Sequence, residues 1–254
     1  MARLIVITSG KGGVGKTTTA INIGASLHSF GKNVLLLDAN LTTPNVGIHL
    51  GAPVVPVNLH HVLAGKNKIA EAVYEHYSGM KIVPASISLD DLKDAKLEKL
   101  SSIATQLKKK YDFIICDSAA GLGKEAATAI SIADDLIVVT NPELPAVTDA
   151  LKVIKLAEDM EKNIAGVVVT RTGKHKKELS LKDIEVMLEK PILGEVPEDI
   201  AVKDSIVERG AVVHTHPKSK AALSYKRLAA KLIHRRYKEP QDFFSRMLRL
   251  VGLK

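Results

Sequence analysis

The residues of this 254-residue chain with the clearest chemical meaning lie at positions 10–18 and read Gly-Lys-Gly-Gly-Val-Gly-Lys-Thr-Thr. Glycines at this spacing let backbone N–H groups curl around phosphate oxygens. A lysine at the end of such a loop reaches the β and γ phosphates of a nucleotide, and the hydroxyl that follows it binds Mg²⁺. The spacing therefore predicts a phosphate-binding loop, in which Lys16 contacts phosphate and Thr17 contacts Mg²⁺. The alternative is a glycine-rich structural turn.

The residues on either side place this loop between a strand and a helix. Positions 4–7 form a short apolar run that is typical of a buried strand. After the loop, Ala20, Ile23 and Leu27 recur at helical spacing, and Gly31 ends the pattern. Because a helix N-terminus carries positive potential, a loop in this position is suited to binding phosphate.

Two further apolar runs each end in an acid, 35–37 before Asp38 and 114–116 before Asp117. Ligands of open parallel sheets bind beyond the carboxyl ends of the strands. We therefore expect both acids to face the loop, with Asp117 holding Mg²⁺ directly or through a water. The alternative for each acid is that it caps the next helix or turn. Gly121 lets the second segment move and present an amide to the γ-phosphate, as in a nucleotide switch.

Strand-like and helix-like segments alternate along the chain, which predicts an α/β fold with a mostly parallel central sheet and helices on both faces. Beyond the first strand, we expect strands at 34–37, 80–83, 113–116, 136–139, 167–170 and 192–196. We expect helices at 96–109, 124–133, 147–158, 181–188 and 219–234. These elements form one domain, residues 1–238.

Composition narrows the class of protein. The chain has no apolar run of the roughly 20 residues that span a membrane and no segment like a signal peptide, so we expect a cytoplasmic protein. Its single cysteine, Cys116, excludes an intramolecular disulfide and a Cys-x-x-Cys site. His214 and His216 would share one side of a strand, without a third metal ligand. The net charge of +8 favours an anionic surface, either membrane or nucleic acid.

With the loop, its second lysine Lys11, and the two acids in place, the chain resembles the MinD/ParA family of deviant P-loop ATPases, and most closely its MinD-like members. The resemblance runs over essentially the whole chain. It implies the P-loop NTPase fold of the SIMIBI type and Mg²⁺-dependent ATP hydrolysis that is slow without a partner protein. It also implies a homodimer closed on ATP, in which Lys11 reaches the nucleotide of the partner subunit.

The resemblance also implies roles for individual residues. Asp38 would orient or polarise the attacking water, Asp117 would support the metal, and Thr18 would help to bind the α-phosphate. The implied catalytic residues are Lys11, Lys16, Asp38 and Asp117, and the implied metal-binding residues are Thr17, Asp38 and Asp117. The residues implied to bind ATP are Gly10, Lys11, Gly12, Gly13, Val14, Gly15, Lys16, Thr17, Thr18, Gly121, Arg171, Pro197, Glu198 and Asp199.

Three positions depart from the family pattern. Asn40 stands where a second acid commonly follows the first-switch aspartate, and Ala119 stands where proline is usual. Arg171 occupies the place at which the family often has an asparagine that reads adenine. An arginine can instead pack on the face of the base.

The end of the chain carries a second pattern. On a helix, one half of the segment from 241 onward is apolar, whereas Asp242, Arg246 and Arg249 occupy the other half. The apolar half contains Phe243, Phe244, Met247, Leu248, Leu250 and Val251. This pattern predicts an amphipathic helix at 239–254 that binds an anionic membrane surface. The alternative is that the segment packs on the body of the protein or on a partner protein.

Together, these features predict an ATP-dependent switch that dimerises on ATP and docks reversibly on the inner face of the cell membrane. By resemblance, it positions cargo proteins in cell division or polarity, and an unidentified partner activates hydrolysis. The competing reading is a ParA-like partitioning ATPase whose basic surface binds nonspecific DNA.

Overall fold

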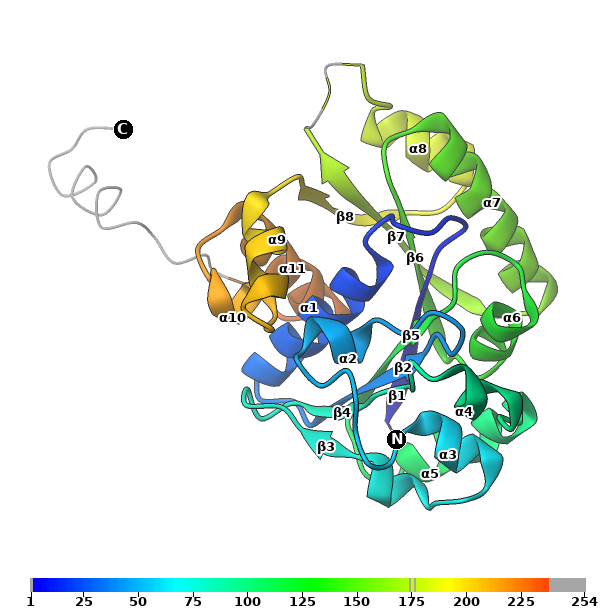
Figure 1. The fold of residues 1–254 in the computed structure, drawn as a ribbon. Coiled ribbons are helices and arrows are strands. Elements are labelled where there is room, and N and C mark those ends of the chain that lie inside the picture. Colours follow the sequence, from blue (N-terminus) through cyan, green and yellow to red (C-terminus); the bar gives the residue numbers. More distant parts are fainter. Residues whose placement is uncertain (1, 174, 176, 238–254) are drawn as a thin grey trace, which may run out of the picture.

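A computed structural model describes residues 2–173, 175 and 177–237, which form an eight-stranded sheet at the centre of the molecule (Figure 1). The spatial order of the strands is β3-β4-β2-β5-β1-β6-β7-β8. Neighbouring strands pair in parallel except β3 and β4, so the predicted fold class is confirmed. The strands are β1 (Arg3–Thr8), β2 (Val34–Ala39), β3 (Tyr74–Glu75), β4 (Lys81–Val83), β5 (Phe113–Ser118), β6 (Asp135–Thr140), β7 (Asn163–Thr172) and β8 (Ile192–Pro197).

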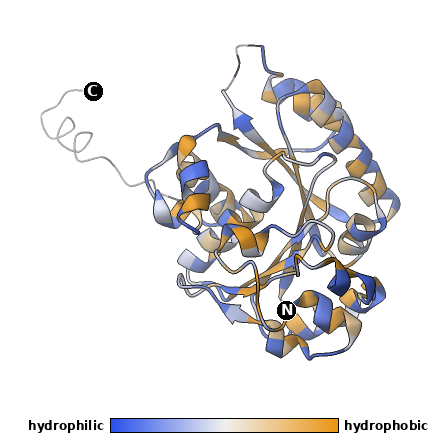
Figure 2. Ribbon diagram, in the orientation of Figure 1, coloured by the Kyte–Doolittle hydropathy of each residue, from blue (hydrophilic) through white to orange (hydrophobic). Residues whose placement is uncertain are grey.

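The central strands are buried on both faces, which is why they read as continuous apolar runs. In β1, Leu4 and Val6 join one core cluster, whereas Ile5 and Ile7 join the cluster on the opposite face of the sheet. Figure 2 shows the same arrangement, with hydrophobic strands in the middle and helices of mixed character around them. Two hydrophobic layers therefore hold the sheet, and the strand ends are left for polar groups.

Helices cover both faces of the sheet (Figure 1). Residues of α1, α10 and α11 pack on one face, and residues of α3, α5, α6, α7 and α8 pack on the other. The helices are α1 (Lys16–Ser29), α2 (Val46–His49), α3 (Leu59–Ala64), α4 (Leu89–Lys93), α5 (Leu100–Leu107), α6 (Lys124–Ser131), α7 (Leu144–Asp159), α8 (Leu181–Leu188), α9 (Ile200–Val207), α10 (Val212–Thr215) and α11 (Lys220–Leu232). Two short 3₁₀ helices are η1 (Ile69–Ala72) and η2 (Leu97–Lys99).

The structure confirms each predicted strand and the existence of each predicted helix, with two corrections. The segment 96–109 is divided into η2 and α5. The strand expected around His214 and His216 is wrong, because this segment is the helix α10. His214 Nε2 lies 3.1 Å from Ser29 Oγ, whereas the imidazole of His216 contacts Thr215, so the two histidines do not form one site.

The predicted amphipathic helix at 239–254 lies outside the described residues. The described chain ends at Tyr237, whose ring centroid is 5.9 Å from that of Phe30 at the end of α1. Arg235 lies over the same Phe30 ring, 5.1 Å from its centroid. Within residues 2–237 as described, no helix is long and apolar enough to cross a membrane.

Gly166 in β7 provides a test of how tightly the β7–β8 edge is packed. Its φ is +144°, and a Cβ atom there would lie 2.6 Å from the Pro191 carbonyl oxygen. We expect Gly166→Ala to lower the free energy of unfolding by about 3 kcal/mol, because the added methyl group has backbone in its way. The control is Gly31→Ala, which also has a positive φ but meets nothing within 4 Å and should cost about 1 kcal/mol. Urea unfolding of both variants measures the difference, and equal losses would contradict it.

Candidate functional site

The loop between β1 and α1 has the backbone geometry of a phosphate-binding loop. Gly13 and Gly15 have φ values of +80° and +91°, which side chains of L-residues rarely adopt. A Cβ atom on Gly12 or Gly13 would meet nothing within 4 Å, so the top of the loop is open to a ligand. Gly10 is different, because a Cβ atom there would lie 2.1 Å from the backbone of Asp149 in α7. The base of the loop is thus in direct backbone contact with that helix.

Two polar residues, Thr170 and Asn141, hold the loop through hydrogen bonds at the Val14 carbonyl. The hydroxyl of Thr170 donates a hydrogen bond to the Val14 carbonyl at 2.5 Å. Asn141 Nδ2 donates to Thr170 Oγ1 at 2.8 Å and lies 3.4 Å from the same Val14 carbonyl. Asn141 and Thr170 were not among the site residues predicted from the sequence. The available signal was their place at the carboxyl ends of β6 and β7, where the sheet binds ligands.

Lys16, Thr17 and Asp117 meet at one carboxylate. Lys16 Nζ lies 2.9 Å from Asp117 Oδ1, and Thr17 Oγ1 donates a hydrogen bond to Asp117 Oδ2 at 2.6 Å. Lys16 is 8% exposed and Asp117 is fully buried, so solvent screens this ion pair little. The two acids also meet as expected, because Asp38 and Asp117 are register partners in β2 and β5.

Asp38 is buried, and among the described residues no cation forms an ion pair with it. Its Oδ1 accepts a hydrogen bond from the Asn40 amide at 3.2 Å, and its Oδ2 accepts one from the Val46 amide at 3.1 Å. Burial, reinforced by the charge of Asp117, raises the pKa of Asp38 to about 8. Asp38 therefore holds a proton far more tightly than an exposed aspartate does.

Lys11 and Gly121 lie at the mouth of the loop. The Gly121 amide, expected to face a γ-phosphate, donates a hydrogen bond to the Ser9 carbonyl at 2.8 Å. Contact with phosphate would require this bond to break. Lys11 is exposed, and within the part of the chain that the structure describes its side chain has no hydrogen bond or ion pair. Its ammonium group is thus available to a group outside the subunit.

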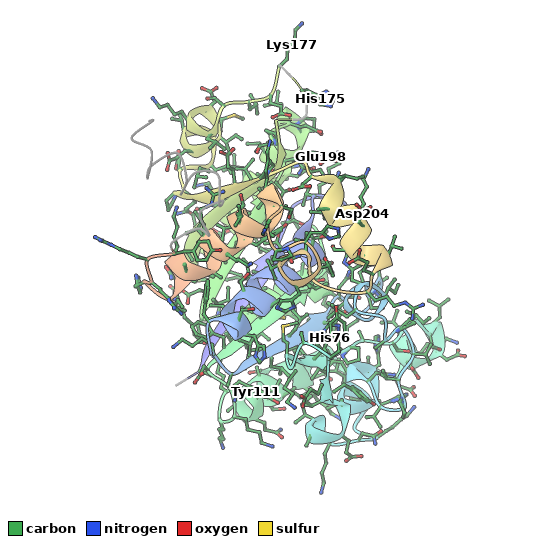
Figure 3. The ribbon with its side chains drawn as sticks, turned by 90° about the vertical axis from the view of Figure 1, so that its left-hand side faces the viewer. His76, Tyr111, His175, Lys177, Glu198 and Asp204 are labelled. Atoms are coloured by element: carbon green, nitrogen blue, oxygen red, sulfur yellow. The ribbon has the colours of Figure 1, made fainter. Side chains whose placement is uncertain are left out.

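A cavity of about 360 Å³ begins beside the loop and brings distant predicted residues together. Arg171, in β7, has a left-handed backbone (φ +58°), and its Nε lies 3.8 Å from Glu198 Oε2. Glu198 precedes α9, the helix that carries Asp204 (Figure 3). The residues from the sequence analysis that line the cavity are Gly15, Thr18, Arg171, Pro197, Glu198 and Asp199. The other residues that line the cavity were not predicted from the sequence; they are Thr170, Val196, Val202, Lys203, Ile206 and Tyr225.

Asp199 has a structural role at this cavity. Its Oδ1 accepts a hydrogen bond from the Ala201 amide, and its Oδ2 accepts one from the Ala221 amide, both at 3.0 Å. The carboxylate therefore caps α9 and also binds the first turn of α11. Both carboxylate oxygens are used within the protein, so the contribution of Asp199 to a ligand comes from its place in the cavity wall.

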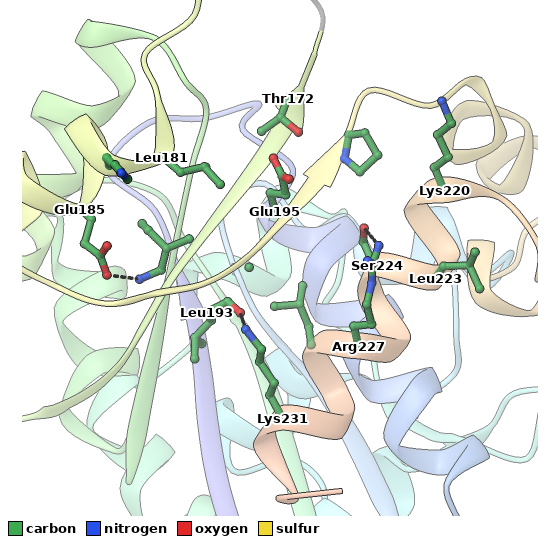
Figure 4. A pocket seen from close by; sticks show the side chains of 15 residues that line it. Thr172, Leu181, Glu185, Leu193, Glu195, Lys220, Leu223, Ser224, Arg227 and Lys231 are labelled. Carbon is green, nitrogen blue, oxygen red and sulfur yellow. Dashed lines mark hydrogen bonds between the residues drawn. The ribbon is translucent and has the colours of Figure 1, made fainter. Parts of the chain in front are cut away.

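A larger cavity of about 690 Å³ lies between α8, β8 and α11 (Figure 4). No residue of the phosphate loop lines it. Lys231 Nζ donates a hydrogen bond to the Leu193 carbonyl, and Glu185 accepts one from the Ile192 amide, so side chains cover part of the β8 edge. We place the functional site at the smaller cavity, because it adjoins the loop and the paired acids.

The groups at the loop fit Mg²⁺ and a nucleotide. Thr17 and Asp117 offer hydroxyl and carboxylate oxygens, the ligand types that Mg²⁺ prefers. Open space above Gly12 and Gly13, with Lys16 close by, suits anionic oxygens. The adjoining cavity has the apolar walls Val196, Val202 and Ile206 that a flat base requires. When bound, Mg²⁺ would neutralise phosphate charge.

The raised pKa of Asp38 predicts a specific pH dependence of stability. The folded-state pKa, about 8, lies above the ordinary value of 3.8, so the stability that Asp38 contributes is complete below pH 4 and is lost as the pH rises to 8. Asn does not ionise, so the variant Asp38→Asn should not lose this stability as the pH rises. We expect the free energy of unfolding of the variant, relative to the parent, to increase from pH 5 to pH 8, by up to about 1.4 kcal/mol per pH unit.

Urea unfolding without nucleotide, at several pH values, measures this difference. The control is Asp90→Asn, the same chemical change on a side chain that is 86% exposed, in which the buried Asp38 and the pH dependence it confers are retained. Parallel profiles for Asp38→Asn would show that the buried acid does not titrate in this range.

Comparison with known proteins agrees with this geometry. A family model described as an AAA domain matches residues 2–168. An ATP-binding protein of Methanocaldococcus jannaschii is 40% identical over 98% of this chain and 96% of its own length. The cell division ATPase MinD of Pyrococcus furiosus is 34% identical and superposes with a TM-score of 0.89, covering 92% of this chain and 99% of that one.

A fourth comparison bears on the ligands. The septum site-determining protein MinD of Pyrococcus horikoshii, solved in complex with Mg-ADP, is 34% identical, with a TM-score of 0.88 and coverage of 91% of this chain and 96% of that one. The family model covers the loop and both acids, and the relative from Methanocaldococcus jannaschii aligns with nearly the whole chain. The chain therefore belongs to the MinD/ParA family of P-loop ATPases, and it is an enzyme that hydrolyses ATP.

Proposed function

We propose that this ATPase is a switch that dimerises on ATP, binds the membrane reversibly and positions partner proteins in cell division or polarity. The observation that carries the proposal is the exposed Lys11 at the mouth of the phosphate loop, with no partner among the described residues of its own subunit. A lysine that contacts ATP only across an interface makes the nucleotide part of that interface.

The proposed roles at the reaction centre follow from the contacts. Lys16 lies 2.9 Å from Asp117, so phosphate oxygens compete with that carboxylate for the ammonium group. Thr17 and Asp117 are the proposed Mg²⁺ ligands. Asp38, at the carboxyl end of β2 beside Asp117, would orient or polarise the attacking water.

Exposed hydrophobic side chains around the loop support an interface on this face. Ile48, Leu122 and Leu144 are each about half exposed, and they follow the carboxyl ends of β2, β5 and β6. The loop lies at the same edge of the sheet, after β1. A second copy of the chain, closed face to face on two ATP molecules, would bury these side chains and bring each Lys11 to the opposite nucleotide.

Lys11→Ala separates dimerisation from nucleotide binding. We expect the variant to bind ATP nearly as the parent does, because Lys16 and the loop amides are retained. Its dimer dissociation constant should rise about 100-fold or more, since removal of a buried charge leaves the opposite phosphates without a partner. Analytical ultracentrifugation with ATP measures the dimer, and a fluorescent ATP analogue measures binding.

Lys109→Ala is the matched control, because Lys109 is an exposed lysine after α5 and away from the loop. It should dimerise as the parent does. If Lys11→Ala also forms a stable dimer with ATP, the cross-subunit role of Lys11 is wrong.

The proposed membrane contact is the C-terminal helix at 239–254, attached to an ATPase domain at 1–238. Insertion of six apolar side chains contributes roughly 9 kcal/mol, but ordering a dozen residues costs a comparable amount. A single tail therefore binds weakly. The exposed Arg235 and Arg236 add attraction to anionic lipid, and a dimer joins two tails, so that the second insertion is effectively intramolecular. ATP would thereby control localisation at the inner face of the membrane and the presentation of cargo and activating proteins.

Co-sedimentation with anionic vesicles tests this switch. We expect the full chain to pellet with ATP at least about tenfold more than with ADP, and a chain that ends at Pro240 to remain in the supernatant. Lys11→Ala should behave like the ADP sample. Absence of pelleting, together with ATP-dependent retention on duplex DNA, would instead support the DNA-partitioning function.

A further inference from the structure

The carboxylate of Glu125 bridges the segment that follows β2 and the segment that follows β5. Glu125 lies in the first turn of α6, after the β5 segment that carries Asp117. Its Oε2 accepts a hydrogen bond from the Thr42 amide at 3.2 Å, and its Oε1 accepts one from the Thr42 hydroxyl. Thr42 lies in the loop after β2, the strand that carries Asp38. Residues 83 positions apart in the chain are thus joined by two hydrogen bonds.

The loop that contains Thr42 determines how Asp38 is held. The Asn40 and Val46 amides, at the two ends of this loop, donate hydrogen bonds to the two oxygens of Asp38. Between them, Asn40 Nδ2 donates to the Thr43 carbonyl at 2.5 Å, and the Thr43 hydroxyl donates to Asn40 Oδ1 at 3.1 Å. Hydrogen bonds therefore run without a break from Asp38 to the residue next to Thr42.

The bridge is placed where it can affect geometry without touching ATP. Thr42 is exposed and Glu125 is partly exposed. Neither residue lines the cavity beside the phosphate loop, and neither belongs to the loop itself. The ends of the same loop determine where the Asp38 carboxylate points. Displacement of a reacting group by about 1 Å can cost on the order of 100-fold in rate. A contact at Thr42 is thus suited to affect turnover rather than affinity.

We propose that Glu125 is a positioning residue for ATP hydrolysis. Through Thr42 it fixes the loop whose amides orient Asp38, and it couples this loop to the segment that carries Asp117. The inference rests on the proposed role of Asp38 as the group that orients the attacking water.

Turnover and nucleotide affinity, measured separately, test this assignment. We expect Glu125→Ala and Thr42→Val each to lower kcat about tenfold, with the Kd for a fluorescent ATP analogue unchanged. Thr42→Ser keeps the hydroxyl and the amide, so it should retain most of the parental kcat. The double variant Glu125→Ala/Thr42→Val should be no slower than Glu125→Ala, because loss of the Glu125 carboxylate already removes both hydrogen bonds to Thr42.

Three controls make the result decisive. Glu98→Ala removes a different first-turn glutamate, which lies exposed in η2, and should have the parental kcat. Thermal unfolding shows whether each variant is folded, and if Glu125→Ala is not, the nearly isosteric Thr42→Val carries the test. Asp38→Ala tests the underlying role, since parental turnover in that variant would overturn the proposed role of Asp38 in orienting the attacking water.

Loss of turnover in Asp38→Ala with parental kcat in Glu125→Ala and Thr42→Val would overturn only the positioning role. A loss of ATP affinity in either single variant, or additive losses of kcat in the double variant, would also overturn it.

Discussion

Two carboxylates lie side by side at the centre of the sheet, and their burial is the constraint on which the rest of the site depends. Asp38 and Asp117 are paired in register, and neither is exposed to solvent. Acids removed from water are strongly destabilising unless their charges are offset or neutralised. Lys16 offsets the charge of Asp117, whereas Asp38 has backbone amides and retains its proton to a higher pH. The first turn of α1 and the loop after β2 must therefore both be in place.

Helix α1 connects the phosphate-binding site to the hydrophobic core. Its first turn provides Lys16, Thr17 and Thr18, and its later turns pack in the same core cluster as α11. At the cavity beside the phosphate loop, the carboxylate of Asp199 binds the start of α11. The phosphate end and the base end of the site thus share one packed unit, and neither end can shift without disturbing the core beneath it.

Much of this arrangement follows from local patterns in the sequence. Continuous apolar runs predict the central strands, and acids at their ends identify Asp38 and Asp117, because parallel strands align their carboxyl ends. Short elements escape such reasoning, and α10 was expected as a strand because four residues do not establish a period.

Other features depend on tertiary packing. The left-handed backbone of Arg171, the support that Asn141 gives to Val14, and the bridge from Glu125 to Thr42 all arise from contacts between distant segments. No local spacing encodes such contacts. The resemblance to a family supplied roles for the residues that share its motifs, but it provided no information about these supporting groups.

The contact between Gly10 and α7 has a consequence for the thermodynamics of ligand capture. Because a methyl group at position 10 would overlap the Asp149 backbone, the base of the loop lies directly on a helix of 16 residues. A loop supported in this way has little conformational freedom to lose when phosphate binds. The entropy lost by ordering the loop therefore subtracts little from the free energy of its contacts with ATP. In this protein, preorganisation of the binding loop depends on the absence of a single side chain.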